Sequence, residues 1–476
     1  MEIKNKYKIV IVGVGVSGIF TALELINKGY NGEDILMIDR GHELDKRRCF
    51  VDGETPCKKC KVCSISNGIG GTGSFSDSKL NFDPSGRVGG DLADLISREE
   101  IIEGLRRTYE IYQQFGIEEF QSKVYGDKHN DVAKYIIQMI KNNPNMDIAD
   151  CITIHLGTDN SRIVYGRMIE YLRENKVTIL GNTSIIEFKE VNGIEVILSD
   201  RKYNISEVAC DKLILAMGRS GNKEVGNMCR QHNIKVVNGR VDYGVRVETL
   251  NEYMKPLNEN FYEAKIYLNG RFGDKTRVFC TNPSGIVSIE SYPYNNDYIY
   301  LANGHAYAEQ EKKTNNTNFA LLVSRNFNED CPNPLDNYLY PLINASSSLG
   351  KGSVICQSLK DIRLNRRSTE ERIAELDIIP TAKCYKGDLT SVMPYRTLVD
   401  ILEAIEELDK ICTGLNGDNT LLYGLEAKFH ANKVVINKHG ETSKKNIYCI
   451  GDCSGWCRGI TTASTMGIFC ADDIKK

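Results

Sequence analysis

The feature that most constrains the fold is an apolar run followed by a glycine-rich turn near the start of the chain. Residues 7–12 are a short β-branched run typical of a buried parallel strand. They lead into a GxGxxG motif at 13–18 and then into apolar residues at helical spacing that end at Gly29. A second apolar run, 35–38, ends at Asp39. This order of strand, glycines, helix, strand and acid predicts a βαβ unit that binds a dinucleotide.

Each part of this unit has a physical role. Gly13 allows the tight turn, Gly15 lets the backbone approach a pyrophosphate, and Gly18 lets helix and strand pack closely. The N–H groups and the dipole at the start of the helix stabilise phosphates, and the Asp39 carboxylate can accept hydrogen bonds from ribose hydroxyls. The predicted cofactor contacts in this segment are Gly13, Gly15, Val16, Ser17, Gly18, Asp39 and Arg40.

Length and charge narrow the class of protein. A chain of 476 residues is too long for one compact core, so we expect two or three lobes. The net charge of −3 argues against a general nucleic-acid binder. No run approaches the roughly 20 apolar residues of a membrane helix. The first strand begins too early to leave room for a signal peptide, so we expect a cytoplasmic protein.

A second glycine cluster, at 68–73, predicts a loop whose backbone lies against a ligand, because such a run cannot form a stable helix interior. Helices are predicted at 101–115, after a capping box at 97–100, and at 131–142 and 159–174. Strand signals at 177–180, 184–188 and 194–198 indicate a β-meander, and a buried strand follows at 212–217. A last strand at 446–450 precedes a closing helix at 461–472. The loop residues predicted to contact the cofactor are Gly70, Gly71, Thr72, Gly73 and Ser74.

The predicted fold class is therefore α/β. It comprises a discontinuous Rossmann-like domain with a β-meander, formed by 1–222 and 441–476 and including the helical segment 91–150. A mixed α+β substrate lobe is inserted at 223–440, where strand-like segments carry many tyrosines.

Three motifs together resemble the FAD-binding domain of glutathione-reductase-like flavoproteins. They are the N-terminal GxGxxG, the LAMGRSG turn at 215–221 and the strand–Gly–Asp–helix segment at 448–463. The resemblance implies that Asp452 binds the ribityl chain and that the following helix directs its N-terminus at the flavin pyrimidine edge, where it stabilises an anionic reduced flavin. The further flavin contacts that it implies are Arg48, Ala216, Gly218, Gly451, Gly459, Ile460 and Thr461.

The whole chain is similar to a family of uncharacterised FAD-dependent dehydrogenases, distantly similar to geranylgeranyl reductases and thiazole-synthesis flavoproteins. The likeness rests on motifs at 47–49, 68–80, 155–159, 215–221 and 451–464. This chain departs from the family's SDGKL pattern by having Ser78. No second GxGxxG follows a strand, so a dedicated NAD(P)H domain is not expected, and electrons would come from the substrate, a protein donor or a nicotinamide visiting the flavin.

The chain contains 16 cysteines, of which four crowd between residues 49 and 63. Basic neighbours favour their thiolate forms. Four thiolates can hold a structural zinc or an iron–sulfur cluster, and redox disulfides or free thiols are the remaining alternative. We predict a metal of open identity, with Cys49, Cys57, Cys60 and Cys63 as ligands. Cys453 and Cys457 are expected to be small, partly buried side chains rather than a redox pair.

Candidate catalytic residues follow the second glycine cluster. Lys79 and Asp77 are expected beside the flavin, where a cation could stabilise its reduced form. His155 could act as an acid or base. Arg246 and His305 fall in the substrate lobe, where each has a structural role as a plain alternative.

The predicted function is an FAD-dependent oxidoreductase that transfers a hydride between flavin and an organic small molecule. One alternative is an iron–sulfur flavoprotein reductase that relays electrons from a protein donor. Another is a flavin-containing RNA-modification or interaction protein, against which the slightly acidic net charge argues.

Overall fold

The computed structural model describes residues 3–49, 60–76, 78–120, 124–125, 130–190, 193–261, 263–295, 297–306, 311, 313–327, 331, 333–428 and 432–474. The chain forms two compact units. The first comprises Met1–Val124, Cys151–Val237 and Asn432–Lys476, and the second comprises Tyr125–Asp150 and Asn238–Ala431.

The first unit is built on a parallel sheet. Its neighbouring strands are β7 (Thr178–Leu180), β2 (Ile35–Ile38), β1 (Lys6–Val12) and β10 (Ile205–Leu215), and β22 (Ile447–Cys449) pairs with the end of β10. Numbered along the chain, these parallel strands have the order 3-2-1-4-5, which is that of a Rossmann-like doubly wound sheet. The predicted α/β fold class is confirmed.

The β-meander branches from the same sheet. The first half of β10 pairs antiparallel with β9 (Ile194–Asp200), which pairs in turn with β8 (Thr183–Glu190). β10 is long enough for its second half to pair with β22 instead. One strand thereby joins the meander to the parallel sheet. The predicted meander strands at 184–188 and 194–198 are confirmed, whereas the strand predicted at 177–180 is β7, which pairs parallel with β2 and not with the meander.

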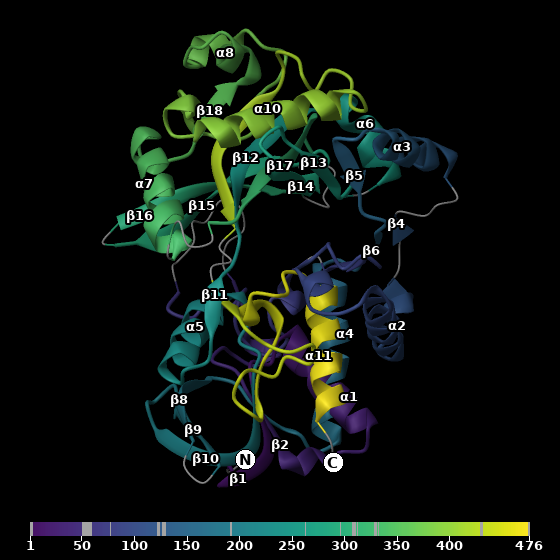
Figure 1. Ribbon diagram of the computed structural model, residues 1–476, viewed down its shortest axis with the longest axis vertical. Helices are drawn as coiled ribbons and strands as arrows, with labels where there is room; N and C mark the ends of the chain where they lie inside the picture. The colour runs from purple at the N-terminus through teal and green to yellow at the C-terminus, as the bar shows by residue number, and fades with distance from the viewer. Residues whose placement is uncertain are drawn as a thin grey trace. The chain divides into compact units, whose positions relative to one another are not determined.

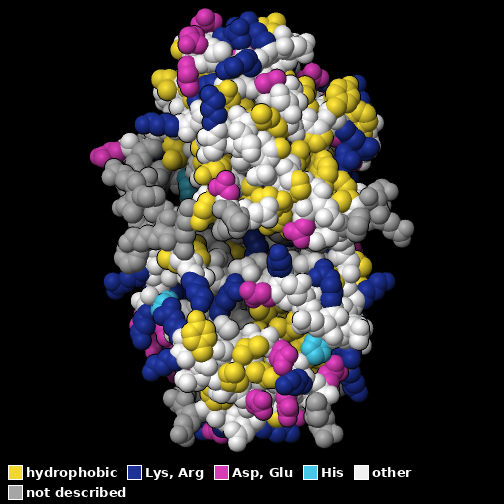
Figure 2. Space-filling model, turned by 90° about the vertical axis from the view of Figure 1, so that its left-hand side faces the viewer, with side chains coloured by type: hydrophobic (Ala, Val, Ile, Leu, Met, Phe, Trp, Pro, Cys, Tyr) yellow, Lys and Arg dark blue, Asp and Glu magenta, His cyan; other side chains and the backbone are white. Residues whose placement is uncertain are grey.

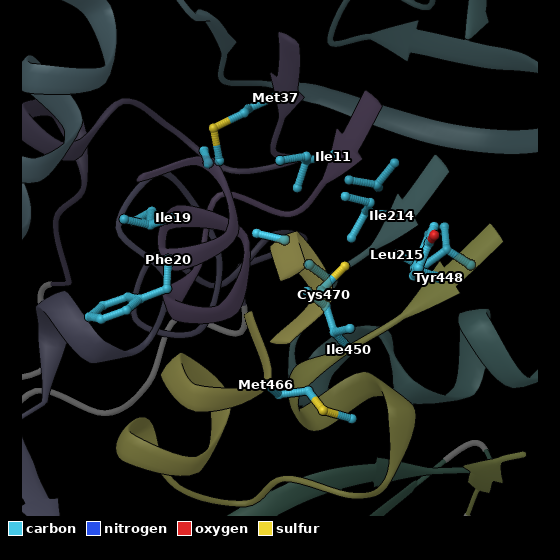
Figure 3. Close-up of a cluster of buried hydrophobic side chains, with 14 of the residues drawn as sticks. Ile11, Ile19, Phe20, Met37, Ile214, Leu215, Tyr448, Ile450, Met466 and Cys470 are labelled. Atoms are coloured by element: carbon cyan, nitrogen blue, oxygen red, sulfur yellow. The ribbon is translucent and has the colours of Figure 1, made fainter. Parts of the chain in front are cut away.

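Helices from both ends of the chain cover this sheet. α11 (Ile460–Asp473) packs against α1 (Val16–Asn27) and α2 (Arg98–Gln114), and α1 also packs against α4 (Thr158–Glu174) (Figure 1). Because α11 has neighbours on several sides, nearly all its side chains are buried. Figure 3 shows side chains from β1, β10, β22 and α11 meeting in one core, among them Ile11, Ile214 and Met466.

Smaller elements complete the first unit. β3 (Lys79–Phe82), β6 (Ile152–His155) and β4 (Val124–Tyr125) form a sheet in the order β3-β6-β4, and β11 (Val236–Asn238) pairs with β21 (Asn432–Val434). α5 is Asn222–Gln231. The predicted capping box at the start of α2 is confirmed, since Ser97 and Glu100 each bind the other's backbone N–H.

The second unit is built on a mixed sheet in the order β19-β18-β20-β12-β17-β14-β13-β5. α10 packs over β12, β13, β14 and β17, and a hairpin of β15 and β16 contacts the same sheet. The strands are β5 (Met146–Ile148), β12 (Val241–Leu250), β13 (Ile266–Asn269), β14 (Lys275–Asn282), β15 (Ile286–Tyr294), β16 (Asp297–His305), β17 (Asn316–Arg325), β18 (Ile355–Ser358), β19 (Tyr385–Lys386) and β20 (Leu421–Lys428). The helices are α3 (Asp131–Asn142), α6 (Asn251–Asn260), α7 (Tyr340–Leu349), α8 (Leu359–Arg363), α9 (Glu370–Ala374) and α10 (Tyr395–Asp409).

The division differs from the predicted boundaries in three places, one of which is that residues 432–440 belong to the first unit. Residues 125–150 belong to the second unit, because β5 pairs with β13 and the apolar face of α3 joins the second core. α5 belongs to the first unit, because Val225, Met228 and Cys229 are part of the first core.

Candidate functional site

A cavity of about 420 Å³ lies at the carboxyl ends of β1, β2 and β10, and every residue that lines it belongs to the first unit. The strand order reverses between β1 and β10, and doubly wound sheets bind ligands at such a switch point. The volume falls within the range of roughly 300–1,000 Å³ typical of small-molecule sites. The predicted cofactor residues that line the cavity are Gly13, Gly15, Val16, Ser17, Asp39, Arg40, Gly71, Thr72, Gly73, Ala216, Gly218, Asp452, Gly459 and Ile460.

Close backbone contacts bring the predicted motifs together. A Cβ on Gly13, whose φ is +111°, would lie 2.1 Å from the Ala216 carbonyl oxygen. A Cβ on Gly71 would lie 2.6 Å from the Cα of Gly15. Real Cβ atoms do not approach other atoms so closely, so glycine is required at both positions. The two glycine loops and the turn after β10 therefore form one continuous backbone wall.

Gly15 itself has space for a larger side chain. A Cβ there would meet only the Cα of Gly71, at 3.7 Å, which is an ordinary contact. Gly15 is also the N-cap of α1, and no described side chain caps that helix. The N–H groups of the first turn lack partners within the helix, and Val16 and Ser17 of this turn line the cavity. The arrangement is suited to binding an anion.

Asp39 ends β2 as predicted and holds three backbone segments. Its carboxylate accepts hydrogen bonds from the N–H groups of Val14 at 3.1 Å, Gly41 at 2.9 Å and Gly68 at 2.8 Å. Two carboxylate oxygens offer about four acceptor positions, so capacity for a ligand hydroxyl is left. Asp39 thus fixes both glycine loops while it lines the cavity.

The arginine that organises the second glycine loop is Arg47. Its side chain is fully buried, and its guanidinium donates to the carbonyl oxygens of Ser64 and Ile65 at 2.9 Å and of Ile69 and Gly71 at 2.8 Å. Burial lowers its pKa to about 10, and the charge of Asp39 acts in the opposite direction. The predicted contact Arg48 is exposed and does not line the cavity.

The C-terminal motif adjoins the first turn of α1 and supplies another part of the cavity wall. Gly451 has a φ of +69°, and a Cβ on it would lie 2.4 Å from Ser17 Oγ. Asp452 follows it in the cavity, 3.8 Å from Arg219 Nε. Burial raises the pKa of the Asp452 carboxyl, and the positive charges of Arg219 and Arg458 act in the opposite direction. The Asp452 carboxyl group is therefore a partly desolvated hydrogen-bond acceptor that lines the cavity.

α11 begins at this wall. Gly459 and Ile460 line the cavity, and within the described part of the chain no side chain caps the helix. Thr461 is 2% exposed, and its Oγ1 has no hydrogen-bond partner among the described residues. Buried hydroxyls normally have a partner. A ligand with polar groups at this helix start would supply partners for both the hydroxyl and the first-turn N–H groups.

Several predicted contacts lie just behind the cavity wall instead of on it. Gly18 packs α1 on its strand, because a Cβ would lie 2.2 Å from the Gly13 carbonyl oxygen. Ser74 is buried and its Oγ accepts a hydrogen bond from Arg47 at 2.9 Å. The predicted residues that do not line the cavity are Gly18, Arg48, Gly70, Ser74, Gly451 and Thr461.

Sequence reasoning missed some lining residues that adjoin the predicted ones. Arg219 follows Gly218, and Arg458 precedes Gly459. Asp91 accepts hydrogen bonds from Arg458 and from Lys433 Nζ, each at 3.2 Å, and so positions Arg458. Arg219 and Arg458 lie within the sequence motifs at 215–221 and 451–464, but only the three-dimensional structure shows that both line the same cavity. Other missed lining residues are Ser66, Asn67, Ser76, Thr183, Ser184, Ile185, Met217, Glu224 and Ala463.

None of the three predicted catalytic residues, Lys79, Asp77 and His155, is among the described residues that line the cavity. Lys79 on β3 lies opposite His155 on β6 in an antiparallel pair, which brings the two backbones together. Lys79 is half-buried and does not line the cavity. Asp77 and the side chain of His155 lie outside the part of the chain that the structure describes. In the second unit, Arg246 is fully buried and forms an ion pair with Glu426 at 2.9 Å.

The described cysteines of the first cluster do not form a metal site. Cys49, Cys60 and Cys63 are exposed, and no group of three or more His, Cys, Asp or Glu among the described residues could hold a metal ion. Cys57 lies outside the described residues, so the predicted four-ligand set is described only in part.

The cysteines near the C-terminus are core residues. Cys453 and Cys457 are fully buried, more so than predicted. Cys453 Sγ accepts a hydrogen bond from the Met217 N–H at 3.2 Å, which links the C-terminal motif to the turn after β10.

Two properties of the described part of the chain concern its surface charge and its hydropathy. On the face drawn in Figure 2, the described Lys and Arg side chains alternate with Asp and Glu side chains. None of the helices in the described part of the chain is long and apolar enough to span a membrane.

Comparisons with known proteins find distant similarities. No protein-family model matches the chain. An "Uncharacterized protein" of Clostridium beijerinckii is 23% identical over 493 residues, covering 98% of this chain and 81% of its own. Among solved structures, tetracycline destructase Tet(51) matches 98% of this chain and 79% of its own at 13% identity and a TM-score of 0.36. L-amino acid deaminase from Proteus vulgaris matches 98% and 93% at 14% identity and a TM-score of 0.36. A variant of the quinol fumarate reductase FrdA of E. coli matches 98% and 69% at 8% identity and a TM-score of 0.42.

Proposed function

We propose that the first unit binds FAD in this cavity and that the protein is an FAD-dependent oxidoreductase acting on a small organic molecule. The observation that carries the proposal is the convergence of three sequence segments on the switch point of a 3-2-1-4-5 sheet. The segments are the GxGxxG turn, the second glycine loop and the Gly-Asp-helix segment that begins at Gly451.

The residues present fit a dinucleotide that carries a flavin. The N-terminus of α1, with Gly15 as its open N-cap, suits the pyrophosphate. Asp39 has acceptor capacity for the adenosine ribose hydroxyls. Asp452 can accept from the ribityl hydroxyls. The α11 N-terminus suits the polar edge of the flavin ring, since the Thr461 hydroxyl there has no partner among the described residues.

Bound FAD would supply a ring that accepts or donates a hydride. The protein would supply binding and orientation. The backbone wall of Gly13, Gly71 and Ala216 excludes side chains from the pyrophosphate region. Arg219 and Arg458 place positive charge beside Asp452, where it would favour an electron-rich ring. The second unit, with its buried ion pair of Arg246 and Glu426, is proposed to carry the substrate contacts.

Flavin binding is tested by adding FAD to purified full-length protein. We expect a flavin absorbance spectrum that stays with the protein through gel filtration, with about one FAD per chain, and a saturable titration that NAD does not match. Protein that is folded by circular dichroism yet retains no FAD would overturn the proposal. Anaerobic reduction of the bound flavin by NADH, NADPH or a reduced ferredoxin then identifies the class of electron donor.

The first cysteine cluster is tested in the same preparation. Iron and zinc analysis of protein purified without oxygen distinguishes an iron–sulfur cluster from a structural zinc at Cys49, Cys57, Cys60 and Cys63. Absence of both metals leaves free or disulfide-bonded cysteines.

A further inference from the structure

Two cysteines of the second unit lie together at the edge of its sheet. β19 pairs parallel with β18, with Ile355 opposite Tyr385 and Cys356 opposite Lys386. Cys384 directly precedes β19, and its Sγ lies 3.8 Å from Lys386 Nζ. Lys386 stands opposite Cys356, so the three side chains lie close together. Cys356 and Tyr423 belong to one small apolar cluster, and the Cys384 side chain packs against that cluster.

The two thiols differ in exposure and in acidity. Cys356 is fully buried, whereas Cys384 is half-buried. The hydrogen bond from Cys356 and the charge of Lys386 lower the pKa of Cys384, against burial and the carboxylates of Glu248 and Glu370. Burial raises the pKa of Cys356 well above its ordinary value. An accessible thiol that ionises readily can attack, and a buried neighbour can resolve the product.

A buried lysine, Lys386, places its ammonium group beside Cys384, and packing of two neutral cysteines would not require such a charge. Its side chain is 7% exposed, and both hydrogen bonds that its Nζ makes with described residues go to Cys384, at 3.2 Å to the carbonyl oxygen and 3.8 Å to Sγ. A buried ammonium group is costly unless a negative charge or strong acceptors are near. A thiolate on Cys384 would supply that charge.

We propose that Cys384 and Cys356 are a thiol–disulfide exchange site, with Cys384 as the attacking thiol and Cys356 as the resolving thiol. The co-reactant is a low-molecular-weight disulfide. The Cys384 thiolate attacks one sulfur of that disulfide, forms a mixed disulfide and releases one thiolate. The Cys356 sulfur then attacks Cys384 Sγ, the mixed disulfide bond breaks, and the Cys356 proton passes to the departing second thiolate. Two protein thiols are oxidised to one disulfide, and the co-reactant is reduced to two thiols.

The edge of the sheet permits the movement that this bond requires. A disulfide needs the two Cα atoms within about 7 Å and the two Cβ atoms directed toward each other, so the backbone at Cys384 needs freedom to adjust against β18. β19 has two residues, and among the described strands it pairs only with β18. It is further held by bonds from Tyr385 N to Val354 O at 3.2 Å and from Gly387 N to Cys356 O at 3.0 Å. A short edge strand can shift toward its neighbour more easily than a strand held on both sides.

The test uses the full-length protein in glutathione redox buffers, followed by acid quench, alkylation of free thiols and tryptic mass spectrometry. The two cysteines fall in separate tryptic peptides, 352–360 and 384–386. We expect the linked peptide pair to appear as the ratio of glutathione disulfide to glutathione rises, and to disappear on reduction. Cys356→Ser should instead accumulate a glutathione adduct on Cys384.

The controls separate this site from general cysteine reactivity. Cys280→Ser, which removes another half-buried thiol of the same unit, should leave the linked pair unchanged. Lys386→Met should slow alkylation of Cys384 by iodoacetamide at pH 7 by about tenfold, because loss of the positive charge raises the pKa of the Cys384 thiol. Wild-type protein that forms no linked pair, or that alkylates at Cys384 no faster than at Cys280, would overturn the proposal without need of any variant.

Discussion

Arg47 Nη1 donates a hydrogen bond of 2.8 Å to the carbonyl oxygen of Gly71. Gly71 lies in turn against Gly15, where a Cβ on Gly71 would approach the Gly15 Cα to 2.6 Å. A buried guanidinium therefore holds one glycine loop against the other. The shape of the cavity depends on a residue that does not itself line it.

Replacing Arg47 by Met should destabilise the first unit. The change removes the arginine donor from the buried carbonyl groups of Ile69 and Gly71 and from the more exposed ones of Ser64 and Ile65. A buried acceptor left unpaired costs roughly 1–3 kcal/mol before relaxation. We expect a decrease of about 3 kcal/mol in the free energy of unfolding in urea and at least tenfold weaker FAD binding.

Arg48→Met is the matched control, since Arg48 is exposed at the next position. It should change the free energy of unfolding by less than about 0.5 kcal/mol. Equal effects of the two substitutions would contradict the role of Arg47.

Gly15→Ala and Gly18→Ala should separate binding from folding. The methyl group that Gly15→Ala adds would make only an ordinary contact of 3.7 Å with the Cα of Gly71. The free energy of unfolding of the variant should therefore lie within about 1 kcal/mol of the wild-type value. That methyl group would project where the pyrophosphate is proposed to approach, and we expect FAD affinity to fall at least tenfold. Fluorescence titration with FAD measures the change.

Gly18→Ala should behave in the opposite way. Its Cβ would lie 2.2 Å from the Gly13 carbonyl oxygen, so α1 must shift, at a cost of roughly 1–3 kcal/mol. If Gly15→Ala bound FAD normally, the α1 N-terminus would not be the phosphate site.

Asp452→Asn should weaken FAD binding with little loss of stability. The carboxylate is proposed to accept from the ribityl hydroxyls, and a hydrogen bond to a charged group is worth about 1.5–3 kcal/mol. The dissociation constant should therefore rise roughly 10- to 100-fold. The control is Asp94→Asn, because the Asp94 side chain is 72% exposed and lies in the same unit. It should leave the dissociation constant for FAD unchanged. An unaltered dissociation constant in Asp452→Asn would place the ribityl chain elsewhere.

Asp400 should make stability depend on pH. Its carboxyl oxygens are buried without a hydrogen-bond partner among the described residues. Burial raises its pKa to about 6, the carboxylates of Asp274 and Glu403 add to the rise, and Arg396 opposes it. The folded state then binds more protons than the unfolded state between about pH 4 and 6. The free energy of unfolding should fall by up to about 3 kcal/mol as the pH rises through this window.

Asp400→Asn should remove most of that fall and make the protein more stable than wild type at pH 7. Urea unfolding at pH 4.5 and pH 7 measures both effects. A wild-type protein whose stability rises between these pH values, with no change of slope in the variant, would contradict the prediction.

The elements of the first unit could be predicted from local patterns. The β1–α1–β2 unit, the capped helix α2 and the meander each carry their signal within a short stretch. The pairing of distant strands could also be inferred, because a parallel sheet brings the carboxyl ends of β1 and β10 together. These ends supply the motif residues that line the cavity.

Other features depend on contacts that no local pattern encodes. β5 is three residues long, and only its pairing with β13 assigns residues 125–150 to the second unit. Arg47 and Arg48 are chemically identical neighbours, and only the packed structure shows which one is buried. Cys356 and Cys384 are separated by strand and helix, so their contact could not be inferred from the sequence.

The first unit is assembled from three separate stretches, the last of which begins at Asn432. A ribosome makes these stretches in order, and the second unit is largely synthesised before the last one. Until α11 has emerged, the nascent chain lacks Asp452, Gly459 and Ile460, and one wall of the cavity is absent. During this time the apolar faces of α1 and α2 that pack against α11 in the folded protein remain exposed. Chaperone dependence during synthesis, and capture of the cofactor only afterwards, are the expected cost of placing the two ends of a chain around one pocket.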